Sequence, residues 1–296
     1  MINKKFLKYL IPSITLAAGI AMTIAGFAMG AKSDYINQLN VTSINSEIST
    51  SGIAGVNIDI SYAELEISAS NDTKNIKIDS ENVARNYLKY SVSNNVLTLK
   101  YSTNKWYEAS AIPLLSKKKG KITITVPADK SFQDIQIKSR TGDLSLNYIS
   151  AGNIYIDCGM GNNSLNTINA DYVEINGSTG NITAENISTD EISIYGKSGD
   201  ICITNLDTKT AVVSDKTGDI SLSGKIKGKS RFNGGLGDIK VCIYGKPDDY
   251  SIYVPKGKII VNGEKTTGTS KGKYTMDVSK KMGDIDISFK SLNSKK

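Results

Sequence analysis

A glycine-containing motif recurs every 19 residues through the middle of the chain. Its six copies begin at residues 141, 160, 179, 198, 217 and 236 and read TGDLSL, MGNNSL, TGNITA, SGDICI, TGDISL and LGDIKV. No residue is inserted or lost between Gly142 and Gly237, and such constant spacing is typical of a solenoid in which each repeat forms one coil. A seventh copy with Gly283 follows after 46 residues, which we interpret as two repeats plus eight extra residues in a longer loop or hairpin.

Each repeat also places apolar residues at the same positions. Counted from the Asp or Asn after the glycine, positions +1, +3, +6, +11 and +13 are mostly apolar. In the fourth copy they are Ile201, Ile203, Leu206, Ala211 and Val213. A spacing of two within each pair indicates a strand with one buried face, so we predict two short strands per repeat, separated by turns. The Gly-Asp dipeptide marks a corner that needs a positive φ or a tight turn.

One such coil cannot be stable by itself, because ordering its backbone costs more than its few apolar side chains contribute. Neighbouring coils must therefore share a core and strand hydrogen bonds. Ile201 and Ile220, both at position +1, should then stack inside the fold. Equivalent strands should pair in parallel, and the crossover preference favours one hand. The sequence predicts an all-β chain folded as a right-handed parallel β-solenoid (β-helix) with 19-residue coils.

The solenoid is expected to span residues 52–290, with regular repeats at 139–244. Residues 52–138 contain strand-like segments at irregular spacing and are interpreted as N-terminal coils, and residues 245–290 as C-terminal coils. Solenoids need atypical ends to protect their open strand edges. The polar residues 32–51 are interpreted as a spacer, and residues 291–296 as a tail.

The N-terminal segment differs from the rest of the chain. Lys4, Lys5 and Lys8 precede an uncharged apolar run at residues 9–31, long enough to cross a hydrocarbon core of ~30 Å. A basic flank before the run keeps the N-terminus in the cytoplasm. We expect residues 1–31 to form a cytoplasmic flank and signal-anchor of a single-pass cell-membrane protein, with the bulk extracytoplasmic on a Gram-positive surface. The alternative is a signal peptide cleaved at Ala31.

The chain contains no histidine, which excludes Ser-His and Cys-His nucleophiles, HExxH zinc sites and imidazole bases. Its formal charge of +7 favours anionic partners. We expect a non-enzyme without catalytic residues, cofactor or metal. The alternative is a carbohydrate-active β-helix enzyme acting on an envelope polysaccharide. Arg140 and Arg231, the arginines within the regular repeats, lie several coils apart, which argues against that alternative.

The three cysteines, Cys158, Cys202 and Cys242, occupy different positions of the repeat. Cys202 and Cys242 are two coils apart, roughly 9–10 Å along the axis at about 4.8 Å per coil. Bridged cysteines need Cα atoms within about 7 Å. We therefore predict no disulfide.

The acid or amide that follows each repeat glycine should form a ladder along one edge. Its members are Asp143, Asn162, Asn181, Asp200, Asp219 and Asp238. Carboxylates about 4.8 Å apart can share a calcium ion. Turn capping is the preferred interpretation, because each coil supplies one such residue and Lys197 and Lys216 offset the charge nearby.

A loop at residues 106–121 carries the candidate binding residues. It combines an aromatic pair with a lysine cluster: Trp106, Tyr107, Lys117, Lys118 and Lys119. That mixture suits an anionic polymer or a membrane surface. Alternatively, its apolar part plugs the solenoid end.

Four tyrosines, Tyr148, Tyr155, Tyr172 and Tyr195, could stack on sugar rings, but they do not share one position of the repeat, so we interpret them as structural.

Several phrases resemble a known family. They are IAGFAMGA, VNIDISYAELEIS, GKITITVP, the recurring [ST]GD[IL], IYVPKGKIIVNG and MGDIDISF. Over residues 10–290 the chain resembles the bacterial putative-adhesin family, a β-strand-repeat domain of unknown function that includes LiaG-like membrane-anchored envelope-stress proteins. The resemblance implies a binding or scaffolding protein of the cell envelope, with a role in adhesion or envelope stress. Its expected partner is an anionic envelope polymer, the membrane surface or a membrane signalling protein, and not nucleic acid.

Overall fold

The computed structural model describes residues 41–102, 119–254, 259–266, 268–269 and 271–290. The predicted membrane segment at 9–31, the tail at 291–296 and the candidate residues Trp106, Tyr107, Lys117 and Lys118 lie outside these ranges. Within them, no helix has the length and apolar character needed to span a membrane. The chain divides into two compact units, Met1–Val41 and Thr42–Lys296, and the second contains the stacked coils.

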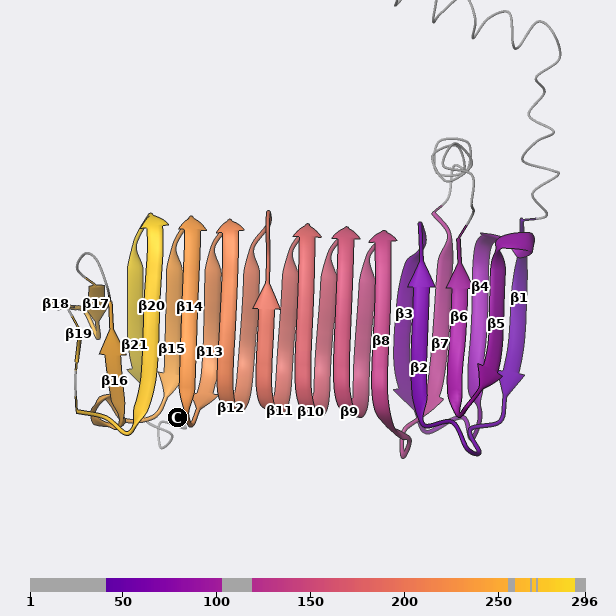
Figure 1. Cartoon of the computed structure of the whole chain (residues 1–296), viewed down its shortest axis with the longest axis horizontal. Coiled ribbons are helices and arrows are strands. Elements are labelled where there is room, and N and C mark those ends of the chain that lie inside the picture. Colours follow the sequence, from indigo (N-terminus) through magenta and orange to yellow (C-terminus); the bar gives the residue numbers. More distant parts are fainter. Residues whose placement is uncertain (1–40, 103–118, 255–258, 267, 270, 291–296) are drawn as a thin grey trace, which may run out of the picture. The chain divides into compact units, whose positions relative to one another are not determined.

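Four consecutive coils form the regular centre of the fold, and each pairs in parallel with the next (Figure 1). They are β9 (Leu144–Met160), β10 (Asn163–Thr179), β11 (Ile182–Tyr195) and β12 (Ile201–Thr217). The register is 19 residues throughout, so that Leu165 lies between Leu146 and Ala184. The predicted all-β, solenoid-like stack of 19-residue coils is therefore confirmed. The right-handed sense of winding stays a prediction.

The prediction of two short strands per coil is wrong for the regular centre. There each coil is one continuous strand of 14 to 17 residues that bends without leaving the sheet. One residue with a positive φ makes the bend, at the fifth position after the corner: Tyr148, Thr167, Asn186 and Asn205, with φ of 60°, 57°, 56° and 55°. A single left-handed residue turns the chain and leaves the flanking hydrogen bonds intact, so no separate turn is needed.

The predicted Gly-Asp corners are confirmed. Every repeat glycine has a positive φ, 141° at Gly161 for example. A Cβ on Gly161 would also overlap the carbonyl oxygen of Gly142 in the preceding coil. Both the backbone conformation and the close stacking of corners therefore require glycine.

The core is a set of apolar columns that run along the stack. Ile201 pairs in register with Ile220, and each is only 1% exposed. This confirms the stack expected at position +1. Equivalent buried side chains of successive coils thus lie in register along the stack.

At the C-terminal end, chain order and spatial order separate. The seventh motif copy lies directly on the sixth, because Ile239 pairs with Ile285 and Leu236 with Met282. The predicted two repeats plus eight residues between them are therefore wrong. The intervening residues pass beyond the last coil, form its outer neighbours and return through two antiparallel pairings (Figure 1).

The strands of this end follow in chain order. They are β13 (Ile220–Ile226), β14 (Lys229–Leu236), β15 (Ile239–Tyr244), β16 (Tyr250–Tyr253), β17 (Ile259–Val261), β18 (Glu264–Thr266), β19 (Gly268–Thr269), β20 (Tyr274–Met282) and β21 (Ile285–Lys290). A short 3-10 helix, Pro247–Asp249, precedes β16.

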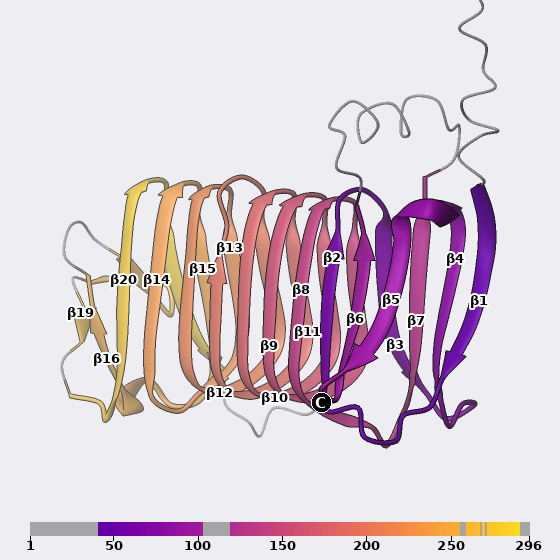
Figure 2. The same cartoon turned by 45° about the vertical axis from the view of Figure 1, so that its right-hand side comes forward.

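The N-terminal end shows the same inversion. Strand β2 lies between β8 and β6, and β3 between β9 and β7, although both precede all of these in sequence (Figure 2). Strands β4 and β5 then add in antiparallel orientation. These strands are β2 (Gly55–Ile60), β3 (Glu64–Ser70), β4 (Ile76–Ala84), β5 (Leu88–Ser93), β6 (Val96–Tyr101), β7 (Lys121–Pro127) and β8 (Ser131–Thr141). The 3-10 helix Arg85–Tyr87 joins β4 to β5.

Strand β1 (Val41–Ile48) pairs with β4, so strand pairing begins within the segment interpreted as a spacer. The physical reason is that β4 offers an open edge, which a preceding segment of the chain can cover.

Candidate functional site

The ladder at the Gly-Asp corners is continuous over seven coils. In each step the side-chain oxygen of one corner residue accepts a hydrogen bond from the backbone N–H of the next. Asp143 Oδ1 accepts from Asn162 at 2.8 Å, Asp200 from Asp219 at 2.9 Å and Asp238 from Asp284 at 2.8 Å. The steps through Asn162, Asn181 and Asp219 have the same geometry.

This geometry supports turn capping over calcium binding. One oxygen of each ladder side chain already holds the neighbouring coil, which is what a capping Asp or Asn does at a turn. Across the described residues, no group of three or more His, Cys, Asp and Glu is placed to hold a metal ion. We therefore interpret the ladder as a seam that fixes the spacing of the corners.

The candidate binding loop arises from this same row of corners. Strand β6 ends at Tyr101 and β7 begins at Lys121, at the end of the coils where the regular repeats have their Gly-Asp corners. The Glu64 N–H donates to the Gly120 carbonyl at 2.8 Å, and the Ala63 N–H to that of Thr141 at 3.1 Å. The base of the loop is thus two steps from the regular ladder.

Of the five predicted binding residues, only Lys119 lies in the described part of the chain. Its ammonium forms an ion pair of 3.1 Å with Glu64, while its side chain stays 76% exposed. The hydrogen bond to that carboxylate raises the pKa of Lys119. Lys121 makes the equivalent pair with Glu66 at 2.7 Å.

Position +15 of the coil, which faces the interior just before the corner, varies more than any core position. It is Cys158 in β9, then Gly177 and Gly196, then Asp215 in β12. A glycine follows at Gly234, and Lys280 occupies the position in β20. No repeat in the sequence marks this column, so sequence reasoning did not find it.

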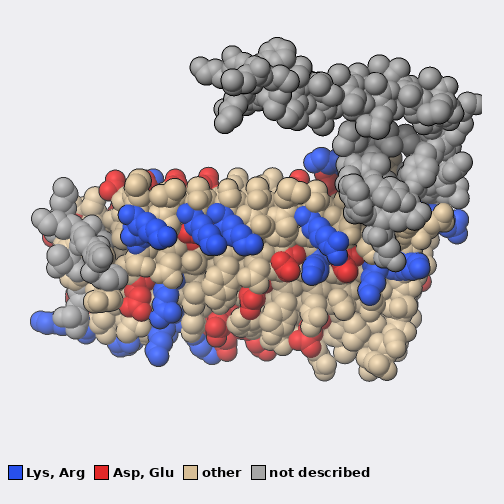
Figure 3. Space-filling model, turned by 45° about the horizontal axis from the view of Figure 1, so that its top comes forward, with Lys and Arg blue, Asp and Glu red and all other residues tan. Residues whose placement is uncertain are grey.

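A groove of about 390 Å³ lies at the surface beside the two adjacent glycines. Tyr195, Asp157 and Asn176 line it from position +14, and Lys197 and Lys216 line it from position +16. Figure 3 shows lysine and arginine side chains gathered in separate blocks along this side of the stack. The groove is therefore a polar, partly basic hollow beside the corner seam.

Asp215 is buried beside this groove, at 3% exposure. Neither of its carboxylate oxygens has a hydrogen-bond partner of good geometry. Burial raises the pKa of Asp215, and the nearby N–H groups of Lys216 and Thr217 offset only part of this effect. Burying a carboxylate without a full set of hydrogen-bond partners lowers the free energy of unfolding.

Cys158 lines the groove one coil before Gly177. Burial, followed by the charge of Asp157, raises the pKa of its thiol to about 12. The thiol is therefore protonated at neutral pH and is a poor nucleophile. All three cysteines are free.

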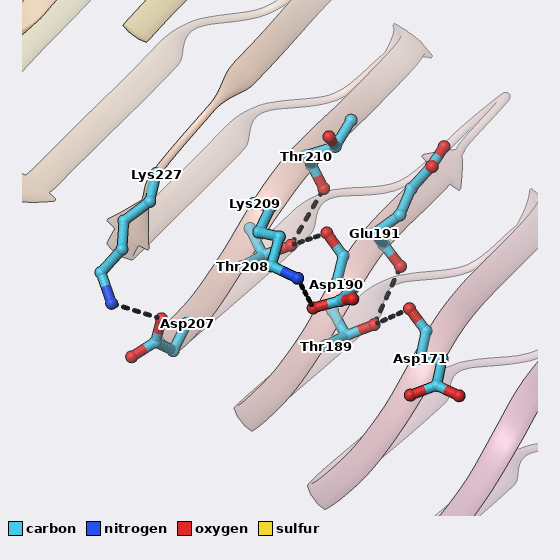
Figure 4. Close-up of polar contacts among 9 residues, drawn as sticks. All are labelled: Asp171, Thr189, Asp190, Glu191, Asp207, Thr208, Lys209, Thr210 and Lys227. Atoms are coloured by element: carbon cyan, nitrogen blue, oxygen red, sulfur yellow. Dashed lines mark hydrogen bonds and ion pairs between the residues drawn. The ribbon is translucent and has the colours of Figure 1, made fainter. Parts of the chain in front are cut away.

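A second polar cluster lies away from the corners, at positions +7 to +10 of the coils (Figure 4). The buried Thr189 hydroxyl can donate to the carbonyl oxygen of Asp171 or of Glu191, each 3.0 Å away. Thr208 repeats this arrangement one coil later, with Asp190 and Thr210. These hydroxyls satisfy backbone carbonyls at positions +9 and +10 of the coils.

Exposed ion pairs join the same coils at their surface, Lys209 with Asp190 at 2.7 Å and Lys227 with Asp207 at 3.5 Å (Figure 4). The hollow between them measures about 260 Å³. Because solvent screens such pairs strongly, they contribute little stability. We interpret this cluster as structural.

The tyrosines are only partly structural. Tyr155 packs against Tyr172 of the next coil with ring centroids 5.5 Å apart, and the Tyr172 hydroxyl donates to Glu174 at 2.8 Å. Tyr148 makes the bend in β9, whereas Tyr195 is 41% exposed on the groove rim. Tyr195 is thus available for contact.

Fold and site together define the class: a solenoid-like all-β protein whose polar groups gather at the corners and bends of its coils. The chain belongs to the Toastrack DUF4097 family, whose model matches residues 53–288. No curated protein matches the sequence.

The architecture is similar to that of a solved structure with a TM-score above 0.5. A putative adhesin from Bacteroides fragilis is 17% identical with a TM-score of 0.55, and the match covers 84% of this chain and 97% of that one. A putative lipid binding protein from Parabacteroides distasonis is 14% identical, with a TM-score of 0.44 and coverage of 84% and 97%. A putative cell adhesion protein from Clostridium sporogenes is 18% identical, with a TM-score of 0.28 and coverage of 85% and 100%. The resemblance seen in the sequence is therefore confirmed at the level of the family.

Proposed function

We propose that this chain is a non-enzymatic binding or scaffolding protein of the bacterial cell envelope that holds an anionic envelope polymer along its row of corners. In this proposal, residues 9–31 anchor it in the membrane and the coils lie outside. The names of the structural neighbours, adhesin and cell adhesion protein, are consistent with a binding role.

The observation that carries the proposal is the position of the lysine-rich loop. It enters after Tyr101 and leaves at Lys119, on the row of corners that also presents Lys197 and Lys216. The capping seam holds these corners at a fixed spacing, and a rigid array of cations attracts a polyanion more effectively than scattered charges. The described corners thus offer Lys119, Lys197 and Lys216 to a linear anionic ligand, between the acidic residues of the ladder.

Binding can be tested with the full chain in detergent micelles and purified cell walls that retain or lack their anionic polymer. We expect co-sedimentation with the first kind of wall. Replacing Lys117, Lys118 and Lys119 with Gln should weaken it about tenfold, because several cations are lost from one contact. The matched control, Lys229→Gln with Lys240→Gln and Lys290→Gln, removes the same charge elsewhere and should have less than about a twofold effect.

Equal sedimentation with both kinds of wall would contradict the proposal. Release of new reducing ends from the wall glycans would instead favour the carbohydrate-active enzyme.

Topology has a separate test. Protease added to intact, wall-stripped cells should digest residues 32–296, because the basic flank keeps only the N-terminus inside. Digestion that occurs only after lysis would contradict the proposed location.

A further inference from the structure

We propose that the groove formed at Gly177 and Gly196 is a binding site for an acidic saccharide unit, meaning a sugar ring that carries a carboxylate or a phosphate. The proposal rests on the function proposed above and gives the anionic polymer a specific contact.

The groove runs over two successive coils in which position +15 is glycine, Gly177 and Gly196. Position +15 faces inward, and the space on the inner side of both glycines is filled by side chains of the core. A Cβ on Gly177 would come within 2.9 Å of Ile182 Cδ1, and one on Gly196 would overlap Asp215 Oδ1. The hollow of about 390 Å³ lies within the range of roughly 300–1,000 Å³ typical of small-molecule sites.

The position +14 side of the groove suits a sugar ring. Tyr195 is 41% exposed there and offers an aromatic face of the kind that packs against the apolar face of a ring. Asp157 and Asn176 stand at the same position in the two preceding coils. A carboxylate and an amide can accept from and donate to ring hydroxyls.

The position +16 side suits an acid. Lys197 and Lys216 occupy equivalent places in successive coils, about 4.8 Å apart along the stack. Among the described residues, neither lysine has an ion-pair partner, whereas Lys209 and Lys227 of the second polar cluster do. Two free ammonium groups at this spacing can hold one carboxylate or phosphate between them.

Asp215 lies behind the groove wall. Its carboxylate is buried, only the N–H groups of Lys216 and Thr217 lie near enough to offset its charge, and Oδ1 takes the space next to Gly196, a residue of the groove wall. The equivalent position is glycine in both neighbouring coils, so the fold does not require an acid here.

Calorimetry on the full chain in micelles tests the proposal with three probes: an oligogalacturonate, a neutral maltooligosaccharide of equal length, and glycerol phosphate. We expect the oligogalacturonate to bind at least about tenfold more tightly than the neutral sugar. Glycerol phosphate binding at similar strength would identify the phosphate-bearing class as the better ligand. Tyr195→Ala should weaken the sugar probes only.

The decisive variant is Lys197→Gln with Lys216→Gln, compared with Lys229→Gln with Lys240→Gln, which removes the same charge from other exposed places. The groove variant should lose about tenfold in affinity and the control less than about twofold. All of these positions are on the surface, and melting curves verify that the variants stay folded.

Equal loss in both double variants, equal affinity for neutral and acidic sugars, or no binding of any acidic probe would overturn the site. If walls are still bound through Lys117, Lys118 and Lys119 in that case, the general function survives and only the groove is wrong. If the groove variant loses oligogalacturonate while wall binding never depended on the anionic polymer, the site stands and the general function falls.

Discussion

The regular centre and the two ends of this molecule are built from the same kind of strand but in a different order. In β9 to β12, a residue's neighbours in space are 19 positions away in sequence, as with Leu146, Leu165 and Ala184. At the C-terminal end Ile239 pairs with Ile285, and at the N-terminal end Ile58 pairs with Ile137. The ends therefore depend on contacts between segments that are far apart in the chain.

The difference follows from what each region must do. A coil in the centre is stabilised by identical coils on both sides, so a local repeat is sufficient. A terminal coil has an open edge, which tends to pair with other chains. Here the chain runs past the last parallel coil and returns, so that the outermost strands are short and antiparallel, as in β18 and β19 with three and two residues.

The largest expected contrast concerns buried charge. Ile201→Asp places a charge without a partner at a position of 1% exposure, and should cost several kcal/mol. Because coils stabilise each other, protease should then cut across the array. Val92→Asp, on the exposed strand β5, should leave the melting temperature within about 2 °C. Equal damage from both would show that the centre is not the cooperative core.

The next contrast compares two glycines with positive φ. Gly199 has φ 127°, and a Cβ would overlap the carbonyl of Gly180, so Gly199→Ala should cost about 3 kcal/mol or more. Gly263, in the β17–β18 hairpin, has φ 86° with nothing within 4 Å, and its Ala variant should cost about 1 kcal/mol. Chemical denaturation of both measures the difference. A similar cost at the two sites would mean that conformation alone, rather than coil stacking, demands glycine.

Asp215 gives a prediction with a pH dependence. Burial raises its pKa in the folded state above the unfolded value of 3.8, so the folded protein holds this proton more tightly. Stability from this group is therefore greatest below pH 3.8 and falls as the pH rises through the folded pKa. Asp215→Asn should raise stability at pH 7 by about 1 kcal/mol and have little effect at pH 3.

Melting curves of the parent and of Asp215→Asn across this pH range provide the measurement. Lower stability of Asp215→Asn at neutral pH would indicate that the carboxylate has a structural partner.

The ladder separates a central corner from the last one. Asp200 caps the N–H of Asp219 at 2.9 Å, so Asp200→Ala should cost about 1 kcal/mol. Asp284 is the last step among the described corners, where its own N–H is capped by Asp238, and Asp284→Ala should cost a few tenths of a kcal/mol at most. Melting in calcium and in chelator should be equal for the parent. A calcium-dependent rise that Asp200→Ala abolishes would instead support a metal-binding ladder.

The smallest effect concerns the inverted N-terminal order. Glu66 of β3 pairs with Lys121 of β7 at 2.7 Å, and both are partly exposed. Glu66→Lys should therefore cost only about 0.2–1 kcal/mol, and adding Lys121→Glu should restore most of it. A double-mutant cycle measures the coupling. A coupling free energy of zero would mean that this ion pair does not help to hold β3 beside β7 and that apolar contacts are sufficient.

The sequence by itself determined the repeat, the parallel pairing at 19 residues, the corners at the glycines and the core columns such as Ile201 on Ile220. These features follow from local spacing, because every coil meets the same environment. The family was also visible in the sequence. The continuous strands were not, because a bend made by one left-handed residue, as at Tyr148 or Asn186, leaves no consistent mark in residue type.

Only the tertiary structure decided the order of the end coils and the place of the groove. The 46 residues between Gly237 and Gly283 fit two repeats by arithmetic, yet the chain uses them to cover an edge and return. The groove depends on Gly177, Gly196 and Asp215 becoming neighbours through stacking, and none of them belongs to the repeating pattern. Contacts between distant segments, and a hollow lined by residues of several coils, exist only after the coils are assembled.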